Sequence, residues 1–137
     1  MNISRERVVE ILRAARRIAV VGLGQNPMRP AYGVAAYLQR AGYTIAPVHP
    51  VAREVLGELV YPDLESAARA GPIDVVNVFR RSETIPTIVA GCVAVRPLLV
   101  WLQVGIRHDE SAREIEAAGI PVVQDRCLAV DHQLLGI

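Results

Sequence analysis

Arginines and glycines that follow short apolar runs are the residues of this sequence best suited to chemistry. Gly22 and Gly24 follow one such run, Arg80 and Arg81 follow another, and Arg29 precedes a helical stretch. Glycines let backbone N–H groups approach a phosphate closely, and the guanidinium fork of arginine matches phosphate oxygens. The pattern therefore favours the binding of a phosphorylated ligand.

The residues after the second apolar run bear on which nucleotide is bound. A dinucleotide fingerprint of the form GxGxxG needs a third glycine where Pro27 stands. An NAD site needs a carboxylate where the chain reads Pro47, Val48 and His49, so NAD is disfavoured. This apolar wall suits an adenine ring, and Arg53 is placed to meet a ribose phosphate. Both NADP and coenzyme A carry such a phosphate, and the residues alone do not separate them.

The ends of the third and fourth apolar runs add three candidates. Phe79 directly precedes the arginine pair. Gln103 is placed to hydrogen-bond an amide of a ligand, and Gly105 would let the backbone approach it. We expect all of these residues to meet at one edge of a sheet.

The elements that would position them alternate regularly along the chain. Short apolar runs predict strands over residues 18–22, 44–48, 74–79, 98–102 and 120–124. Helices are predicted from a cap at Ser4, over 31–41, from a cap at Asp63 to 70, over 83–95, from a cap at Asp109 to 118, and over 129–135. We therefore predict an α/β fold in a single domain over 1–137. It would be a Rossmann-like, doubly wound, parallel five-stranded sheet with helices on both faces. The expected strand order is 3-2-1-4-5, with the ligand beyond the carboxyl ends of the strands.

The composition excludes several broad classes of function. A hydrophobic content of 52% excludes disorder, and a formal net charge of +1 argues against a broad nucleic-acid interface. The apolar runs are shorter than the ~20 residues that span a bilayer, and the first residues lack the apolar segment of a signal peptide. We expect a cytoplasmic protein that binds neither nucleic acid nor membrane.

Taken together, the strand ends resemble those of the small CoA-binding domain family, which is similar to the N-terminal nucleotide-binding domain of the succinyl-CoA synthetase alpha subunit. The resemblance covers about residues 5–134 and rests on the order of several short stretches. These are 18–22, 26–30, 33–38, 47–50, 54–58, 61–62, 74–83, 100–106 and 125–127.

The resemblance implies a Rossmann-like domain that binds coenzyme A, with the pyrophosphate at the glycine turn. Together with the residues above, the candidate cofactor-binding set is Gly22, Gly24, Asn26, Pro27, Arg29, Pro47, Val48, His49, Arg53, Phe79, Arg80, Arg81, Gln103 and Gly105. The chain departs from the family in two ways. Members commonly have Ser where this chain has Gly24, and many have Asn at His49 with Lys or Arg near Val51.

The sequence offers little for catalysis. The synthetase relatives react through a phosphorylated histidine on a second domain, and we expect this chain to have no such domain. Cys127 and His132 form a pair that in principle makes a thiolate nucleophile, but we favour a packed Cys127 and a solvent-facing His132. The three histidines have no metal-site spacing. We expect no catalytic residue and no metal.

We therefore expect a binding module for coenzyme A or an acyl-CoA. Cys127 could also form a mixed disulfide with the thiol of bound CoA. Two alternatives remain, namely an NADP-dependent enzyme and an interaction protein with a vestigial nucleotide pocket. The latter would dock to a partner acyl-transfer enzyme, and the oligomeric state stays open.

Overall fold

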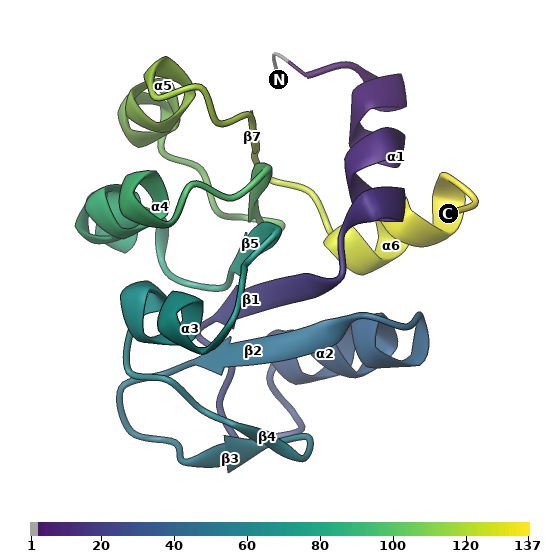
Figure 1. Cartoon of the computed structure of the whole chain (residues 1–137), viewed down its shortest axis with the longest axis vertical. Coiled ribbons are helices and arrows are strands. Elements are labelled where there is room, and N and C mark those ends of the chain that lie inside the picture. Colours follow the sequence, from purple (N-terminus) through teal and green to yellow (C-terminus); the bar gives the residue numbers. More distant parts are fainter. Residues whose placement is uncertain (1–2) are drawn as a thin grey trace.

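Five short strands form one parallel sheet in the computed structural model, which describes residues 3–137. The strands are β1 (Arg17–Val21), β2 (Thr44–Val48), β5 (Val75–Val78), β6 (Leu99–Leu102) and β7 (Val122–Val123). Their order across the sheet is β2-β1-β5-β6-β7 (Figure 1). All strand residues except Arg17 and Thr44 are buried, as expected for a sheet covered on both faces.

The predicted strand order is wrong, although the predicted fold class is confirmed. The third strand of the main sheet, β5, pairs with β1 instead of β2, so the order in this sheet, numbered along the chain, is 2-1-3-4-5. Pro47 supplies the physical reason. It has no N–H, and its carbonyl on the outer side of β2 accepts a hydrogen bond from Tyr61 N at 2.9 Å. Because proline inside a sheet is confined to edge strands, β2 takes the edge.

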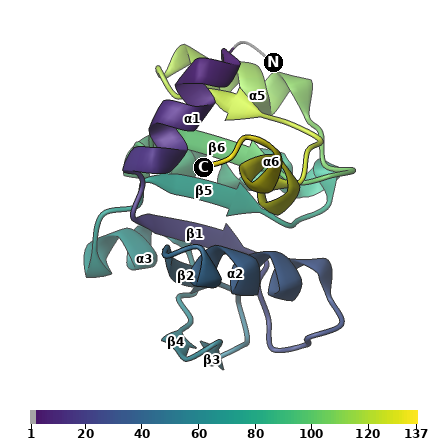
Figure 2. The ribbon, with the colours of Figure 1, turned by 90° about the vertical axis from the view of Figure 1, so that its right-hand side faces the viewer.

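Three helices cover one face of the sheet. They are α1 (Arg5–Ala14), α2 (Pro30–Arg40) and α6 (Leu128–Leu134), which lie on the same side of the strands in Figures 1 and 2. Their buried residues pack with the strand residues that point to this face, such as Ile18, Val20 and Trp101. This face carries the first of two apolar cores.

The second core lies on the opposite face, under α3 (Leu64–Ala70), α4 (Val89–Val95) and α5 (Asp109–Ala117). The predicted helix over 83–95 is split here into a 3₁₀ segment, Ser82–Ile88, followed by α4. Pro86 lies inside the 3₁₀ segment. Proline removes an N–H and disfavours an α-helix interior, which explains why the α-helix begins only after it.

The helix caps agree with two predictions and correct a third. Ser4 and Asp63 cap α1 and α3 as predicted, accepting hydrogen bonds from backbone N–H groups three residues later. At α5 the cap is His108, whose Nδ1 accepts from Ser111 N at 3.2 Å. Asp109 instead accepts a hydrogen bond from Gln124 at 3.1 Å.

A small hairpin that no sequence pattern predicted is formed by β3 (Glu54–Val55) and β4 (Glu58–Leu59). Both turn residues, Leu56 and Gly57, have positive φ (52° and 79°), as a two-residue hairpin turn requires. The hairpin lies beyond the β2 edge, apart from the main sheet (Figure 1). In residues 3–137, no helix combines the length and the apolar character needed to cross a membrane.

Candidate functional site

A cleft of about 1270 Å³ lies at the carboxyl ends of the strands. It is lined by the segments that follow β1, β2, β5 and β6, and it exceeds the roughly 300–1,000 Å³ of common small-molecule pockets. Ten of the fourteen predicted site residues line it: Gly22, Gly24, Asn26, Arg29, Val48, His49, Phe79, Arg80, Arg81 and Gln103. The expectation that these residues meet at one sheet edge therefore holds geometrically.

The other four predicted residues, Pro27, Pro47, Arg53 and Gly105, are not part of the lining. Pro47 lies within β2, before its carboxyl end. Arg53 is exposed at the base of the hairpin, where its carbonyl accepts from Val60 N at 2.9 Å. The N–H of Gly105 donates to Asp125 at 2.7 Å.

The lining also includes residues that the sequence analysis did not single out. They are Gln25, Pro30, Ala31, Pro50, Val51, Ala52, Pro62, Thr84, Val104 and Ile106. Most directly neighbour a predicted residue, so adjacency was the available signal. Pro62 is different, because it reaches the cleft only through the pairing of Tyr61 with Val48 beside β2.

Gly22 sits where the ends of three neighbouring strands converge. Its N–H donates to Val48 O on β2, and the next strand over approaches through Phe79 N, which donates to Val21 O, both at 2.8 Å. Gly22 has a φ of +95°, and a Cβ at this position would collide with the carbonyl oxygen of Phe79. Only glycine fits this turn, because both the conformation and the close approach exclude a side chain.

The amino-terminal end of α2 opens into the cleft. Arg29 occupies the cap position without a capping hydrogen bond from its side chain, and Pro30 begins the helix. The preceding loop is held by Asn26, whose Oδ1 accepts from Met28 N at 3.0 Å and whose carbonyl accepts from Arg29 N at 3.1 Å. Pro30 has no N–H and Tyr32 N donates to Arg29 O at 3.1 Å, so it is mainly the dipole of this 11-residue helix that favours an anion at its start.

Three arginines give the cleft a positive charge. Arg29, Arg80 and Arg81 are exposed and line it, and none of them forms a salt bridge within residues 3–137. No Asp or Glu belongs to the lining of the cleft in that part of the chain. A concave surface lined by charges of one sign raises the local concentration of ligands of the opposite sign.

His49 is held in one tautomer by the backbone. Its Nδ1 accepts hydrogen bonds from Val51 N at 3.1 Å and Ala52 N at 3.0 Å. Because both partners are donors, Nδ1 carries no proton, and the proton of the neutral ring is on Nε2. That nitrogen lies 3.2 Å from the place where a Cβ on Gly24 would stand. His49 therefore presents an N–H donor beside the glycine turn.

The predicted environment of His132 is wrong, since the residue is buried instead of facing solvent. Only 6% of it is exposed, and its Nδ1 lies 2.7 Å from the hydroxyl of Tyr37. Burial lowers the pKa of this histidine. Cys127 precedes α6 and does not line the cleft, while burial raises the pKa of Cys92 to about 12. His132 thus packs against Tyr37 and Tyr43, whereas Cys127 is half-buried.

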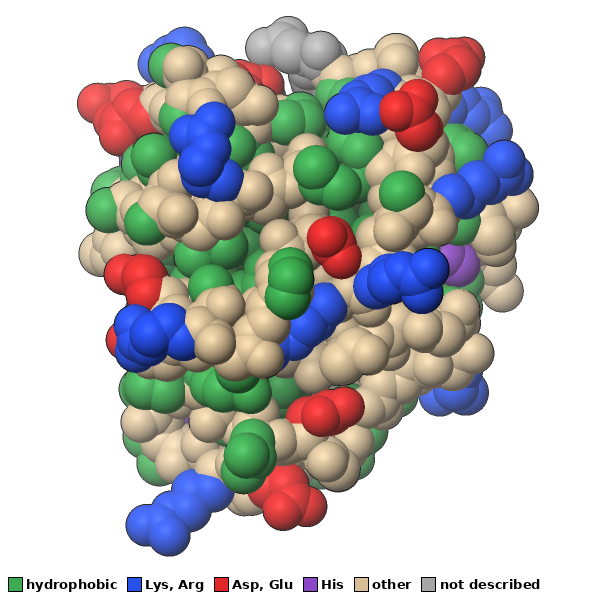
Figure 3. Space-filling view, in the orientation of Figure 1, with side chains coloured by type: hydrophobic (Ala, Val, Ile, Leu, Met, Phe, Trp, Pro, Cys, Tyr) green, Lys and Arg blue, Asp and Glu red, His purple; other side chains and the backbone are tan. Residues whose placement is uncertain are grey.

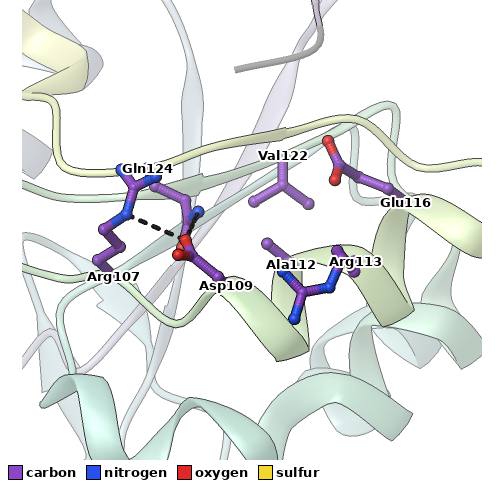
Figure 4. A pocket seen from close by; sticks show the side chains of 7 residues that line it. All are labelled: Arg107, Asp109, Ala112, Arg113, Glu116, Val122 and Gln124. Atoms are coloured by element: carbon purple, nitrogen blue, oxygen red, sulfur yellow. Dashed lines mark hydrogen bonds and ion pairs between the residues drawn. The ribbon is translucent and has the colours of Figure 1, made fainter.

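A second, smaller cavity of about 290 Å³ lies between α5 and β7. Arg107 and Asp109 form an ion pair of 3.0 Å at its rim, and α5 contributes Arg113 and Glu116 (Figure 4). Charges of both signs line this cavity, in contrast to the large cleft. The face shown in Figure 3 likewise carries acidic and basic side chains side by side, without a continuous basic patch.

Comparison with known proteins places these features in a family. The chain is 38% identical over 131 residues to the uncharacterized protein YneT of Bacillus subtilis, covering 96% of each. It resembles the structure of cell-free ID.343 from Thermus thermophilus with a TM-score of 0.92 and 39% identity, covering 97% of this chain and 99% of that one. An acetyl-coenzyme A synthetase of Candidatus Korarchaeum cryptofilum shares the fold alone. Its TM-score is 0.72 at 20% identity, over 84% of this chain and 27% of that one. A sequence profile of the CoA binding domain matches residues 16–133, and the chain therefore belongs to the CoA binding domain family.

Proposed function

We propose that the protein binds coenzyme A or an acyl-CoA in the large cleft. The observation that carries the proposal is a cleft in a CoA binding domain that holds three arginines and the start of α2, with no Asp or Glu among its described lining residues. The pyrophosphate would lie at the turn of Gly22 and Gly24 and the start of α2. The adenosine would rest on Val48 and His49.

The residues after β5, which form another wall of the cleft, also fit coenzyme A. Phe79 supplies an apolar surface, and Arg80 and Arg81 supply guanidinium groups for phosphate oxygens. Among the described residues, neither cysteine (Cys92 or Cys127) nor the buried His132 belongs to the lining of the cleft. The proposed role is therefore that of a binding module.

A thermal-unfolding panel with CoA, acetyl-CoA, NAD, NADP and ATP tests this proposal. We expect CoA or acetyl-CoA at 100 times its dissociation constant to stabilise the fold by ~2.7 kcal/mol. Stabilisation by NADP without a response to CoA would overturn the proposal in favour of an NADP-dependent enzyme. A flat response to all five ligands would overturn it in favour of an interaction protein with a vestigial pocket.

A further inference from the structure

Gln103 combines deep burial with a place in the cleft lining. It follows β6, only 5% of it is exposed, and its N–H donates to Val78 O at 3.2 Å. A side-chain amide has an oxygen that accepts and an NH₂ group that donates, and buried polar groups are normally hydrogen-bonded. The orientation of this amide therefore decides what the cleft offers a ligand.

The start of α6 determines that orientation. The backbone N–H of Leu128 donates to Oε1 of Gln103 at 2.9 Å. A backbone N–H only donates, so the atom that faces it must be the oxygen. A second donor, Nδ2 of Asn77, meets the same Oε1 at 3.1 Å. The NH₂ group of Gln103 must point the other way.

Asn77 donates to Gln103 even though its own side-chain oxygen is left without a partner in residues 3–137, which costs folding free energy. It is fully buried on β5, and its Nδ2 also lies 3.3 Å from Trp101 O. Its Oδ1 is buried without a hydrogen-bond partner among the described residues. An apolar residue would avoid this unsatisfied oxygen, but it would also release one of the two donors that hold Gln103.

The NH₂ group of Gln103 has no hydrogen-bond partner within residues 3–137. Its neighbours in the cleft lining include the apolar Val104 and Ile106. The NH₂ group is a neutral donor, and a neutral acceptor such as a carbonyl oxygen suits it. β6 is also two strands away from β1, about 10 Å across the sheet, so a ligand with its pyrophosphate at Gly22 reaches Gln103 with another part.

We propose, resting on the proposed function, that Gln103 donates a hydrogen bond to a carbonyl oxygen of the ligand, either of the pantetheine amides or of an acyl thioester. Gln103 is then a specificity-determining residue, with Asn77 and the start of α6 as its positioning partners. The cleft would recognise adenosine and phosphates at one end and a carbonyl at the other.

Calorimetric titration of Gln103→Glu tests this inference, because the carboxylate keeps one oxygen for Leu128 N and replaces the NH₂ group by an acceptor. The ligands are CoA, acetyl-CoA, S-ethyl-CoA (which lacks the thioester carbonyl) and adenosine 3′,5′-bisphosphate (which lacks the pantetheine arm). We expect the affinity ratio of CoA or acetyl-CoA to the bisphosphate to fall about tenfold. Gln133→Glu, an exposed residue on α6 with the same charge change, should leave the ratio unchanged.

The ligand arms separate the two sources of the carbonyl. A loss shared by CoA, acetyl-CoA and S-ethyl-CoA assigns the pantetheine amide, and a loss confined to acetyl-CoA assigns the thioester. Equal losses for all ligands, or no loss, would overturn the inference. If the wild-type protein binds none of the four ligands, the proposed function itself fails.

A measurement on the unaltered chain guards against a variant that does not fold. The side-chain NH₂ signals of Gln103 in ¹⁵N-labelled protein should shift on addition of CoA or acetyl-CoA. The bisphosphate should leave them in place. A shift of the same size with the bisphosphate would contradict the carbonyl contact.

Discussion

At the residue scale, Gly24 leaves the space that the ring of His49 occupies. The family resemblance leads one to expect Ser and Asn at these two positions, and this chain has Gly and His instead. The ring of His49 is tied to two backbone N–H groups, and its Nε2 stands 3.2 Å from any Cβ at Gly24. A larger residue at one position therefore requires a smaller residue at the other.

This pairing predicts a non-additive double-mutant cycle. Gly24→Ser alone should weaken CoA binding and lower the free energy of unfolding, because the tethered His49 ring cannot move away freely. Adding His49→Asn should recover much of both losses, with a coupling energy of about 0.5–3 kcal/mol. Titration with CoA and urea unfolding of the four proteins would measure it. Additive effects would show that the two departures are unrelated.

Arg80 and Arg81 carry a second prediction at this scale. If they hold phosphate oxygens, replacing either by Ala should weaken CoA binding by ~1.5–3 kcal/mol, the scale of charged hydrogen bonds. Arg113→Ala is the matched control, since Arg113 lines the smaller cavity instead of the cleft. CoA affinities that stay within twofold of wild type for both cleft variants would contradict a role in phosphate binding.

At the element scale, α6 is attached to its neighbours through a titratable side chain. His132 contacts the hydroxyl of Tyr37 on α2 and lies edge-on to the rings of Tyr37 and Tyr43, each with centroids 5.5 Å away. Desolvation lowers the pKa of His132 below its ordinary 6.5 in the folded protein. The folded state therefore takes up a proton at His132 less readily than the unfolded chain does.

The lowered pKa of His132 makes the folded protein less stable at acidic pH. Between the two pKa values the unfolded state binds more protons, so the free energy of unfolding should fall as the pH drops below about 6.5. Urea unfolding at pH 8, 7, 6 and 5 would measure this fall. His132→Gln, which keeps a hydrogen-bonding side chain but does not titrate in this range, should show a shallower decrease. An identical pH profile in the variant would assign the effect to other groups.

The elements themselves were largely predictable, because each strand of the main sheet lies in a short apolar run that helical stretches separate from the next. The exceptions have local causes. β3 and β4 have two residues each, one of which is a glutamate, so no apolar run marks the hairpin as it marks the equally short β7. Pro86 lies in the first half of the predicted helix over 83–95, and its missing N–H accounts for the 3₁₀ segment found there.

At the scale of the whole molecule, the strand order places the cleft. The chain crosses from β1 to β2 by way of α2 on one face and from β2 to β5 by way of α3 on the other. The connection after β1 therefore runs to one side of the sheet and the connection after β5 to the other. The loops after these two strands diverge, and a crevice lies between them. Gly22 and Phe79, which meet in the structure, mark this switch point.

The charge distribution belongs to the same scale. All 15 basic residues of the chain are arginines, and the formal net charge is only +1. Three of these arginines nevertheless line the cleft without a lining carboxylate in residues 3–137. A nearly neutral protein thus presents a local positive field where the helix end of α2 also favours an anion.

The sequence by itself determined the fold class, the strand ends and most residues of the cleft, because apolar runs and turn residues are local signals. Only the tertiary structure decided the strand order, the burial of His132 and the orientation of the Gln103 amide. Each of these depends on partners distant in sequence. Pro47 acts through Tyr61 at the sheet edge, His132 through Tyr37, and Gln103 through Leu128 N. Such contacts form only when the chain has packed, and no local pattern encodes them.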